Sequence, residues 1–309
     1  MATPFPTFVA VGHDGIRLLS ADGVTWNIAA SGKEGEVYRA VAFANGRCVA
    51  VGTFGGKNVM TSTADGKTWA AGSHDGKYRY RLLGVATGQP GGAETFVGIG
   101  GDPGSVGSSS PFVLLSTDGV KWSDQITIPG RHIIRRLAWG NGKFVGVGDR
   151  GRRATSVDAK DWKDSPGARA AHTLIDVCFG GPAGKMLFVG VGMHGLRMTS
   201  EDGMTWSAPL PGEEGEHLNS VLWTGTQFVA VGAGATYLSP DGKAWTRKPN
   251  TNAPQVAAYG VPEGGKGLFV GTAWRGRILT SADAVEWKDV HRAASPIEAV
   301  GFGVLAGSV

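Results

Sequence analysis

The sequence has few of the features that mark several common protein classes. Its 309 residues include only two cysteines, Cys48 and Cys178, each inside an apolar run, which indicates buried thiols in preference to a disulfide or a metal site. No apolar run approaches the ~18 residues that cross a bilayer. The net charge is +4, without the run of about five or more like charges that marks a nucleic-acid-binding arm. We therefore expect neither a membrane span nor a nucleic-acid partner.

Glycine, in contrast, is abundant. It accounts for 51 of the 309 residues, about 16 % where ~7 % is usual. Ten tryptophans and twelve phenylalanines accompany it, enough aromatic surface to support a hydrophobic core. The composition therefore predicts a folded chain with many tight turns, where glycine avoids steric clashes.

One seven-residue pattern recurs seven times. It reads Ser/Thr-x-Asp-Gly/Ala-x-x-Trp, hereafter the box, and successive box tryptophans are separated by 43, 53, 40, 44, 39 and 42 residues. A period near 40 residues with strand and turn signals inside it is typical of propeller blades. The box aspartates are Asp22, Asp65, Asp118, Asp158, Asp202, Asp241 and Asp283.

Each repeat contains four candidate strands, A to D in chain order. In the second repeat, strand A ends at 41–43, an Asn-Gly turn leads to strand B at 48–52, strand C precedes the box, and strand D begins at the box tryptophan. The chain starts with a strand B and ends with a strand A at 297–302, so the last strand is predicted to complete the first blade. The sequence thus predicts an all-β, seven-bladed propeller of four-stranded antiparallel blades, as a single domain over residues 1–309.

The boxes resemble the Asp-box, or BNR, repeat of the sialidase-like propellers, and the longer segment 11–23 resembles the repeat of YCF48-like photosystem II assembly factors. The resemblance covers nearly the whole chain and implies the propeller fold. Hydrolases, lyases, receptors and assembly factors share the motif, so it assigns no activity. The arginine motif that precedes the first box of sialidases is missing, so sialidase activity is not expected. The resemblance implies an extracytoplasmic location, although residues 1–8 lack the basic and apolar regions of an export signal.

The box itself predicts a structural turn. Its aspartate can accept hydrogen bonds from turn N–H groups, its glycine can take a positive φ, and its tryptophan can pack between blades. The seven aspartates lie on different blades, too dispersed to converge on one ion. We therefore assign all seven to the fold.

The histidines point to one face of the ring. All seven fall in predicted B-to-C loops or D-to-A segments, which share a face. His132 and His172 occupy the same position before strand A, and Glu216, followed by His217, does so in the next repeat. Imidazoles beside a carboxylate suit a metal or general acid–base chemistry. The alternative is that each side chain caps a strand or packs on a neighbour.

Arginines recur on the predicted innermost strands. Arg39, Arg81 and Arg135 each lie four residues before the aromatic or aliphatic position of strand A, where they can line the channel. Guanidinium groups gathered there suit a carboxylate, sulfate or phosphate ligand. The alternative is a set of ion pairs with Asp176, Glu298 and the acidic segment 213–216.

Three further predictions concern loops. Trp274 lies outside the box and strand A, and is predicted to project from a B-to-C loop, where it could stack on a sugar or cover a blade edge. Arg150, Arg152 and Arg275 are predicted to be solvated loop charges. The Gly/Ser-rich segment 100–111 is predicted to be a mobile loop and a candidate lid.

Three functions stay open at this point. The first is a binding propeller that recognises an anionic ligand, with a glycan as the leading candidate, on the His/Arg-rich face. The second is a glycan-cleaving enzyme, a glycoside hydrolase or a polysaccharide lyase, acting at the axial funnel. The third is a protein-docking assembly factor similar to the YCF48-like proteins. We expect a monomer.

The residues assigned to these functions overlap. The ligand-binding candidates are Arg39, Arg81, Arg135, His132, His172, His217 and Trp274. The catalytic candidates are His172, Asp176 and Glu216. The sequence requires no cofactor, but a metal at the axial face would have as candidate ligands His132, His172 and His217.

Overall fold

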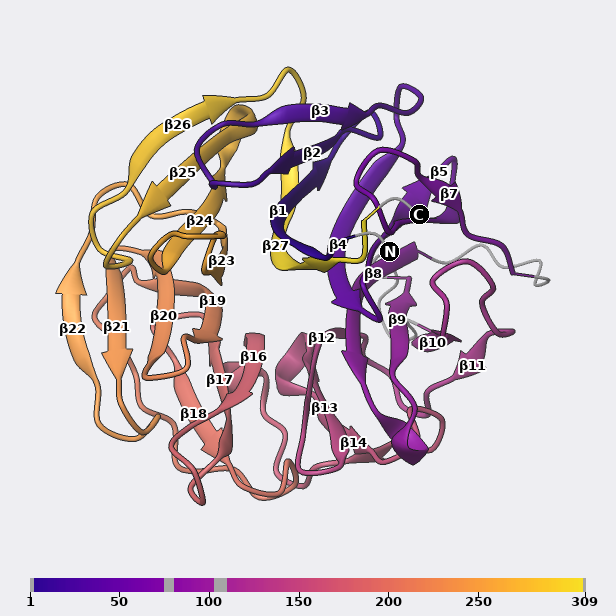
Figure 1. The fold of residues 1–309 in the computed structure, drawn as a ribbon. Coiled ribbons are helices and arrows are strands. Elements are labelled where there is room, and N and C mark those ends of the chain that lie inside the picture. The colour runs from indigo at the N-terminus through magenta and orange to yellow at the C-terminus, as the bar shows by residue number, and fades with distance from the viewer. Residues whose placement is uncertain (1–2, 75–80, 103–109, 308–309) are drawn as a thin grey trace.

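A computed structural model describes residues 3–74, 81–102 and 110–307, and places seven antiparallel sheets around a central axis (Figure 1). Six sheets join strands that follow one another in the chain. In the remaining sheet, which is the first blade, β27 (Ile297–Leu305) pairs with β1 (Phe5–Gly12) along the length of β1. The other blades are numbered from the second to the seventh in chain order. The predicted seven-bladed propeller and its closure by the last strand are therefore confirmed. Most of the predicted mobile loop at 100–111 lies outside the described residues.

Strands A to D run from the axis outward in each sheet. The A strands are β27, β4 (Val37–Ala44), β8 (Arg81–Gly88), β12 (Ile134–Gly140), β16 (Leu174–Gly180), β19 (His217–Trp223) and β23 (Val256–Gly260). The B strands are β1, β5 (Arg47–Phe54), β9 (Thr95–Gly101), β13 (Lys143–Gly148), β17 (Leu187–Gly192), β20 (Phe228–Ala233) and β24 (Leu268–Ala273).

The two outer layers are shorter. The C strands are β2 (Arg17–Ser20), β6 (Lys57–Thr63), β10 (Phe112–Ser116), β14 (Arg153–Ser156), β18 (Arg197–Ser200), β21 (Ala235–Ser239) and β25 (Arg277–Ser281). The D strands are β3 (Asn27–Ala30), β7 (Ala70–Ala71), β11 (Ile126–Thr127), β15 (Lys163–Asp164), β22 (Thr246–Pro249) and β26 (Lys288–Arg292). In the fifth blade, strand D is reduced to a bridge between Arg197 and Leu210.

In the described part of the chain, helical structure is limited to four short 3-10 turns. They are η1 (Pro90–Gly92), η2 (Asp149–Gly151), η3 (Ala170–His172) and η4 (Trp274–Gly276). Within the described ranges, no helix is long and apolar enough to cross a membrane.

The B strands supply the core because both of their faces are covered by neighbouring blades. Phe8 of β1 is fully buried, and its ring centroid lies 4.6 Å from that of Phe302 on strand A of the same blade. Hydrophobic clusters also join blades: one contains Val51 of the second blade together with Leu82 and Phe96 of the third. Shared clusters make the ring a continuous scaffold for its loops.

A β-bulge near the start of strand A recurs in six blades. One residue of strand A has no partner on strand B there, so it interrupts the regular alternation of side chains between the two faces of the sheet. The skipped residues are Arg39, Leu83, Arg135, Ile175, Asn219 and Glu298. In the seventh blade, Gln255 stands at the equivalent position immediately before β23, which pairs without a shift.

The bulge brings strand A so close to the end of strand B that glycine is required there. A Cβ at Gly52 would lie 1.8 Å from the carbonyl oxygen of Val37, and one at Gly232 would lie 1.7 Å from that of His217. The seventh blade, which pairs without a shift, has Ala273 at this position. Part of the glycine excess thus follows from this repeated backbone contact.

The boxes form compact hydrogen-bonded turns. In the first, Oδ1 of Asp22 accepts hydrogen bonds from the N–H groups of Val24 and Thr25 at 2.8 and 2.7 Å, and from the Ser20 hydroxyl at 2.9 Å. The indole N–H of Trp26 donates to the carbonyl of residue 23 at 3.0 Å. Burial raises the pKa of Asp22, but the hydrogen bonds to its carboxylate outweigh burial and lower the pKa to about 2. Each box aspartate is thus engaged within its own turn.

Candidate functional site

An axial hollow of about 720 Å³ lies where the A strands begin. Much of its lining comes from the bulge position or its equivalent on successive A strands: Glu298, Arg39, Leu83, Arg135, Ile175 and Gln255. The repeated bulge therefore places a row of unlike side chains around one opening. The remaining polar lining includes His13, Arg136, Trp274 and Arg275.

Arginine dominates the charge of the axial hollow. Among the described residues, Arg39, Arg135, Arg136 and Arg275 line it, against one carboxylate, that of Glu298. Arg275 is exposed, and within the described part of the chain its guanidinium makes no hydrogen bond or ion pair. The hollow is consequently positive and suits an anionic ligand.

The other charged groups of the hollow are partly neutralised. Glu298 lies 2.6 Å from Nε2 of His13 and 3.6 Å from Nη1 of Arg39. Arg135 forms a two-pronged ion pair with Asp149, at 2.5 Å from Nε and 3.1 Å from Nη2. These pairs hold the side chains in place at the opening, and they leave Arg275 as the exposed cation.

A second hollow, of about 560 Å³, adjoins the first and shares Ile175, Gln255 and Trp274 with it. Trp274 is 74 % exposed, as predicted for a side chain that projects from a B-to-C loop. Among the described residues its lining contains no carboxylate, lysine or arginine, and its polar members are His217, Asn219, Asn250, Thr251, Asn252 and Gln255. The described lining of this hollow is therefore polar without a permanently charged side chain.

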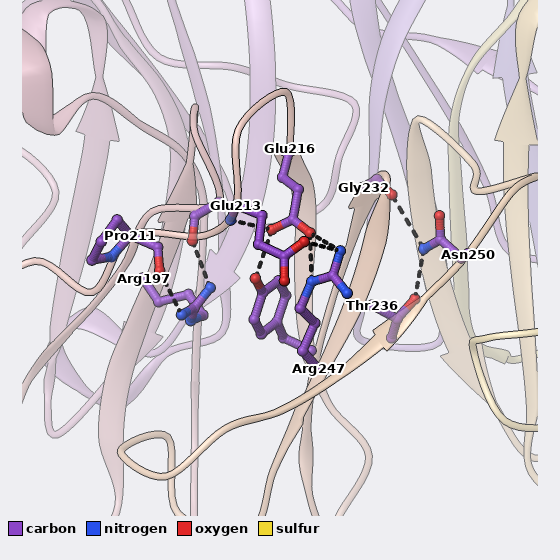
Figure 2. Close-up of polar contacts among 10 residues, drawn as sticks. Arg197, Pro211, Glu213, Glu216, Gly232, Thr236, Arg247 and Asn250 are labelled. Carbon is purple, nitrogen blue, oxygen red and sulfur yellow. Dashed lines mark hydrogen bonds and ion pairs between the residues drawn. The ribbon is translucent and has the colours of Figure 1, made fainter.

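Glu216 is a buried structural anchor (Figure 2). Its carboxylate accepts hydrogen bonds from the Tyr237 hydroxyl at 2.6 Å, Nε of Arg247 at 2.7 Å and the N–H of Glu213 at 2.9 Å. The residue is 2 % exposed. Burial raises the pKa of Glu216, but the hydrogen bonds, with that of Tyr237 foremost, hold it below its usual value.

The three catalytic candidates have separate contacts. Asp176 lies on β16, where its carboxylate accepts hydrogen bonds from the N–H groups of Val177 and Val221, both at 2.9 Å, and burial raises its pKa. His172 ends η3, in the segment before that strand. Among the described residues, no hydrogen bond or ion pair joins His172, Asp176 or Glu216 to another of the three. Both carboxylates are engaged in structural hydrogen bonds, and a catalytic role for the three residues stays a prediction.

The three candidate metal ligands also lie apart. The carbonyl of His132 accepts a hydrogen bond from Arg152, Nδ1 of His217 accepts one from the N–H of His194, and His172 ends η3. In residues 3–74, 81–102 and 110–307, no group of three or more His, Cys, Asp or Glu side chains is placed to hold a metal ion.

One predicted register is wrong. Leu83, two residues after Arg81, occupies the bulge position of Arg39 and Arg135, because Thr87 pairs with Phe96 as Phe43 pairs with Cys48. Arg81 is exposed and is not among the lining residues of the axial hollow.

The sequence reasoning also missed members of the site. Arg136 and Arg275 line the hollow, although Arg275 was expected to be a solvated loop charge. Arg152, also expected to be solvated, is only 5 % exposed. Counting back from the glycine at the end of strand B, which marks the bulge, would have located the lining residues of strand A.

The comparisons with known proteins support the fold. No protein-family model and no curated protein matches the chain. A solved structure described as YCF48 bound to D1 peptide is similar with a TM-score of 0.54 at 16 % identity, over 80 % of this chain and 83 % of that one. The WD40 β-propeller domain of Doa1 is similar with a TM-score of 0.62 at 11 % identity, over 96 % and 89 %. At such identities the likeness shows a shared propeller architecture alone.

Proposed function

We propose that the chain is a binding module that takes an anionic segment of a protein partner in the axial hollow. The observation that carries the proposal is the excess of arginines over carboxylates in its lining, with Arg275 exposed and unpaired. A volume of about 720 Å³ is in the usual range of ligand sites. A similar propeller, YCF48, is described as bound to a peptide, which favours a carboxylate-bearing peptide as the first ligand to test.

The test is calorimetric titration with a short glutamate-rich peptide that has a free carboxyl end, and with its glutamine counterpart. Arg275→Ala is expected to weaken binding of the acidic peptide about tenfold, because a charge-assisted hydrogen bond contributes about 1.5 kcal/mol or more. Higher ionic strength should weaken it further.

The matched control is Arg292→Ala, which removes an exposed arginine of the same blade outside the axial lining. This variant should bind as the unmodified chain does. Equal affinity for the glutamate and glutamine peptides, or equal losses in the two arginine variants, would overturn the proposal.

An anionic glycan is the second candidate ligand, favoured by Trp274. Its exposed indole separates the positive hollow from the second hollow, so a sugar ring could stack there while its carboxylate reaches the arginines. Trigalacturonate is the probe, with maltotriose as its neutral counterpart. If a glycan is the ligand, trigalacturonate should bind more tightly than the acidic peptide. The substitution Trp274→Ala should then weaken the binding of trigalacturonate more than the binding of the peptide. Failure of both anionic probes to bind would reject both candidates.

A further inference from the structure

Strand C of three blades carries a buried arginine at the same place. Arg17, Arg153 and Arg197 each lie three residues before the box serine, and they are 8 %, 3 % and 7 % exposed. Each donates to a carbonyl of the following D-to-A segment, that of Ser31, Gly167 or Pro211. Each guanidinium also lies over an aromatic ring of the next blade. The three arginines are therefore equivalent parts of the repeat.

In the first and fifth blades a glutamate accompanies this arginine. Glu36 follows Arg17 by 19 residues, and Glu216 follows Arg197 by 19 residues. Both carboxylates lie against a glycine four residues earlier: a Cβ at position 32 would meet Oε2 of Glu36 at 2.3 Å, and one at position 212 would meet Oε2 of Glu216 at 2.4 Å. Burial lowers the pKa of Arg197, and Tyr237 and then the Glu216 charge act in the opposite direction. In the fifth blade the acid therefore partly offsets a buried cation.

The fourth blade lacks this acid. The residue 19 positions after Arg153 is His172, and Ala168 stands in place of the glycine. Among the described residues, no ion pair joins Arg17, Arg153 or Arg197 to a carboxylate, and Nε of both Arg153 and Arg197 lacks a hydrogen-bond partner. The fourth blade differs in that no nearby acid offsets the effect of burial, which lowers the pKa of Arg153, whereas the Glu216 charge acts on Arg197.

A second buried arginine adds to the imbalance. Arg152 occupies the position of Ile16 and Leu196 in the equivalent blades, and is 5 % exposed. Arg152 forms an ion pair with Asp164 at 3.0 Å. Asp164 is the one carboxylate among the described residues that line the same small hollow as both arginines. Two adjacent buried guanidinium groups therefore share one acid, which is costly unless another anion balances them.

A small hollow lies at this point. Its volume is about 110 Å³, and its lining residues are Arg131, His132, Arg150, Arg152, Arg153, Asp164, Ser165 and Ala168. None of these lines the axial hollow. The space corresponds to that of roughly three or four water molecules, which suits one tetrahedral oxyanion and is too small for a sugar ring.

We propose that this hollow binds a tetrahedral oxyanion, phosphate or sulfate, in place of the glutamate that the first and fifth blades supply. Guanidinium N–H groups of Arg150, Arg152 and Arg153 are its donors, because planar guanidinium groups bind such oxygens with charge-assisted hydrogen bonds. The anion offsets the buried charge of Arg153 and ties the fourth blade to the segment that leads into the fifth. The proposal is independent of the ligand of the axial hollow.

Thermal unfolding in sodium phosphate, compared with sodium chloride at matched ionic strength, tests the proposal. An anion that binds only the folded chain raises Tm in a saturable way, so a rise of a few degrees is expected with phosphate over chloride. Arg275→Ala should retain this response, because the axial hollow is a different site. Equal Tm values in the two salts would overturn the proposal, and loss of the response in Arg275→Ala would assign the anion to the axial hollow.

The decisive variant is His172→Glu, which supplies the repeat's missing acid. It should raise Tm in the absence of phosphate and reduce the response to phosphate, since the internal carboxylate replaces the ion. His291→Glu, the same charge change on β26, should keep the full response. Titration followed by ³¹P NMR should show exchange broadening in the unmodified chain and little in His172→Glu. A full phosphate response in His172→Glu contradicts the proposal.

Discussion

The carboxylate of Glu216 is bound by the hydroxyl of Tyr237, the guanidinium of Arg247 and the N–H of Glu213. Its residue type and its place beside His217 suit acid–base chemistry, but these contacts leave it 2 % exposed and held ionised. The sequence could not reveal this, because Tyr237 and Arg247 lie 21 and 31 residues further along the chain. At this scale the residue type predicts the available chemistry, and only the neighbours decide its use.

Glu216→Gln is expected to destabilise the fold by about 2 kcal/mol, because it removes the charge from hydrogen bonds to a buried carboxylate. Chemical denaturation measures the change. Glu214→Gln is the matched control: Glu214 is exposed in the same segment, and its substitution should stay within about 0.5 kcal/mol of the unmodified chain. Equal effects of the two substitutions would show that the Glu216 contacts contribute nothing.

At the scale of elements, the bulged pair of strands A and B determines which strand A side chains line the axial hollow. The boxes were predictable from sequence because their hydrogen bonds join residues at most a few positions apart: Ser20 donates to Asp22, and the indole of Trp26 donates to the carbonyl of Gly23. The bulge depends on pairing between strands, so it has no local signature on strand A, and Arg81 was placed where Leu83 stands. The glycine at the end of strand B is its clearest trace in the sequence.

Gly232→Ala tests this relation between bulge and glycine. The added Cβ would meet the carbonyl oxygen of His217, so the strand must shift at a cost of about 1–3 kcal/mol, measured by chemical denaturation. The reverse change in the blade without a shifted register, Ala273→Gly, should cost about 0.5–1 kcal/mol from backbone entropy and about 0.8 kcal/mol from the loss of a buried methyl group. A Gly232→Ala variant as stable as the unmodified chain would be inconsistent with the close contact.

At the scale of the whole molecule, the seven box turns are expected to lose their contribution to stability over the same acidic pH range. Each box aspartate has a pKa below its usual 3.8 in the folded chain, about 2 for Asp22. The stability they contribute is therefore complete above the unfolded pKa and is lost as pH falls from about 4 toward 2. Asp176, whose pKa is raised by burial, has the opposite effect on stability in acid, but it is a single group and the box aspartates are seven.

Scanning calorimetry across pH checks this expectation. Tm should change little between pH 7 and pH 5 and should fall steeply between pH 4 and pH 2. Asp22→Asn should lower Tm at pH 7 and show a smaller further loss in acid. A Tm that stays constant down to pH 2 would contradict the assigned role of the boxes.

At this same scale, the repeat period predicted the fold, and the arginine positions predicted part of the lining of the axial hollow. This hollow combines Arg39, Arg135 and Trp274 from the predicted set with Arg136 and Arg275, which sequence reasoning missed. His132 and His172 are not among its lining residues, because they lie three residues before the bulge positions of β12 and β16.

The proposal that the axial hollow binds an anionic ligand is tested most directly by a crystal structure of the chain with the glutamate-rich peptide at low ionic strength. We expect a peptide carboxylate within hydrogen-bond distance of Arg275 or Arg135, with the chain of the peptide passing Trp274. A peptide bound on another surface, with the axial hollow holding only solvent, would contradict it.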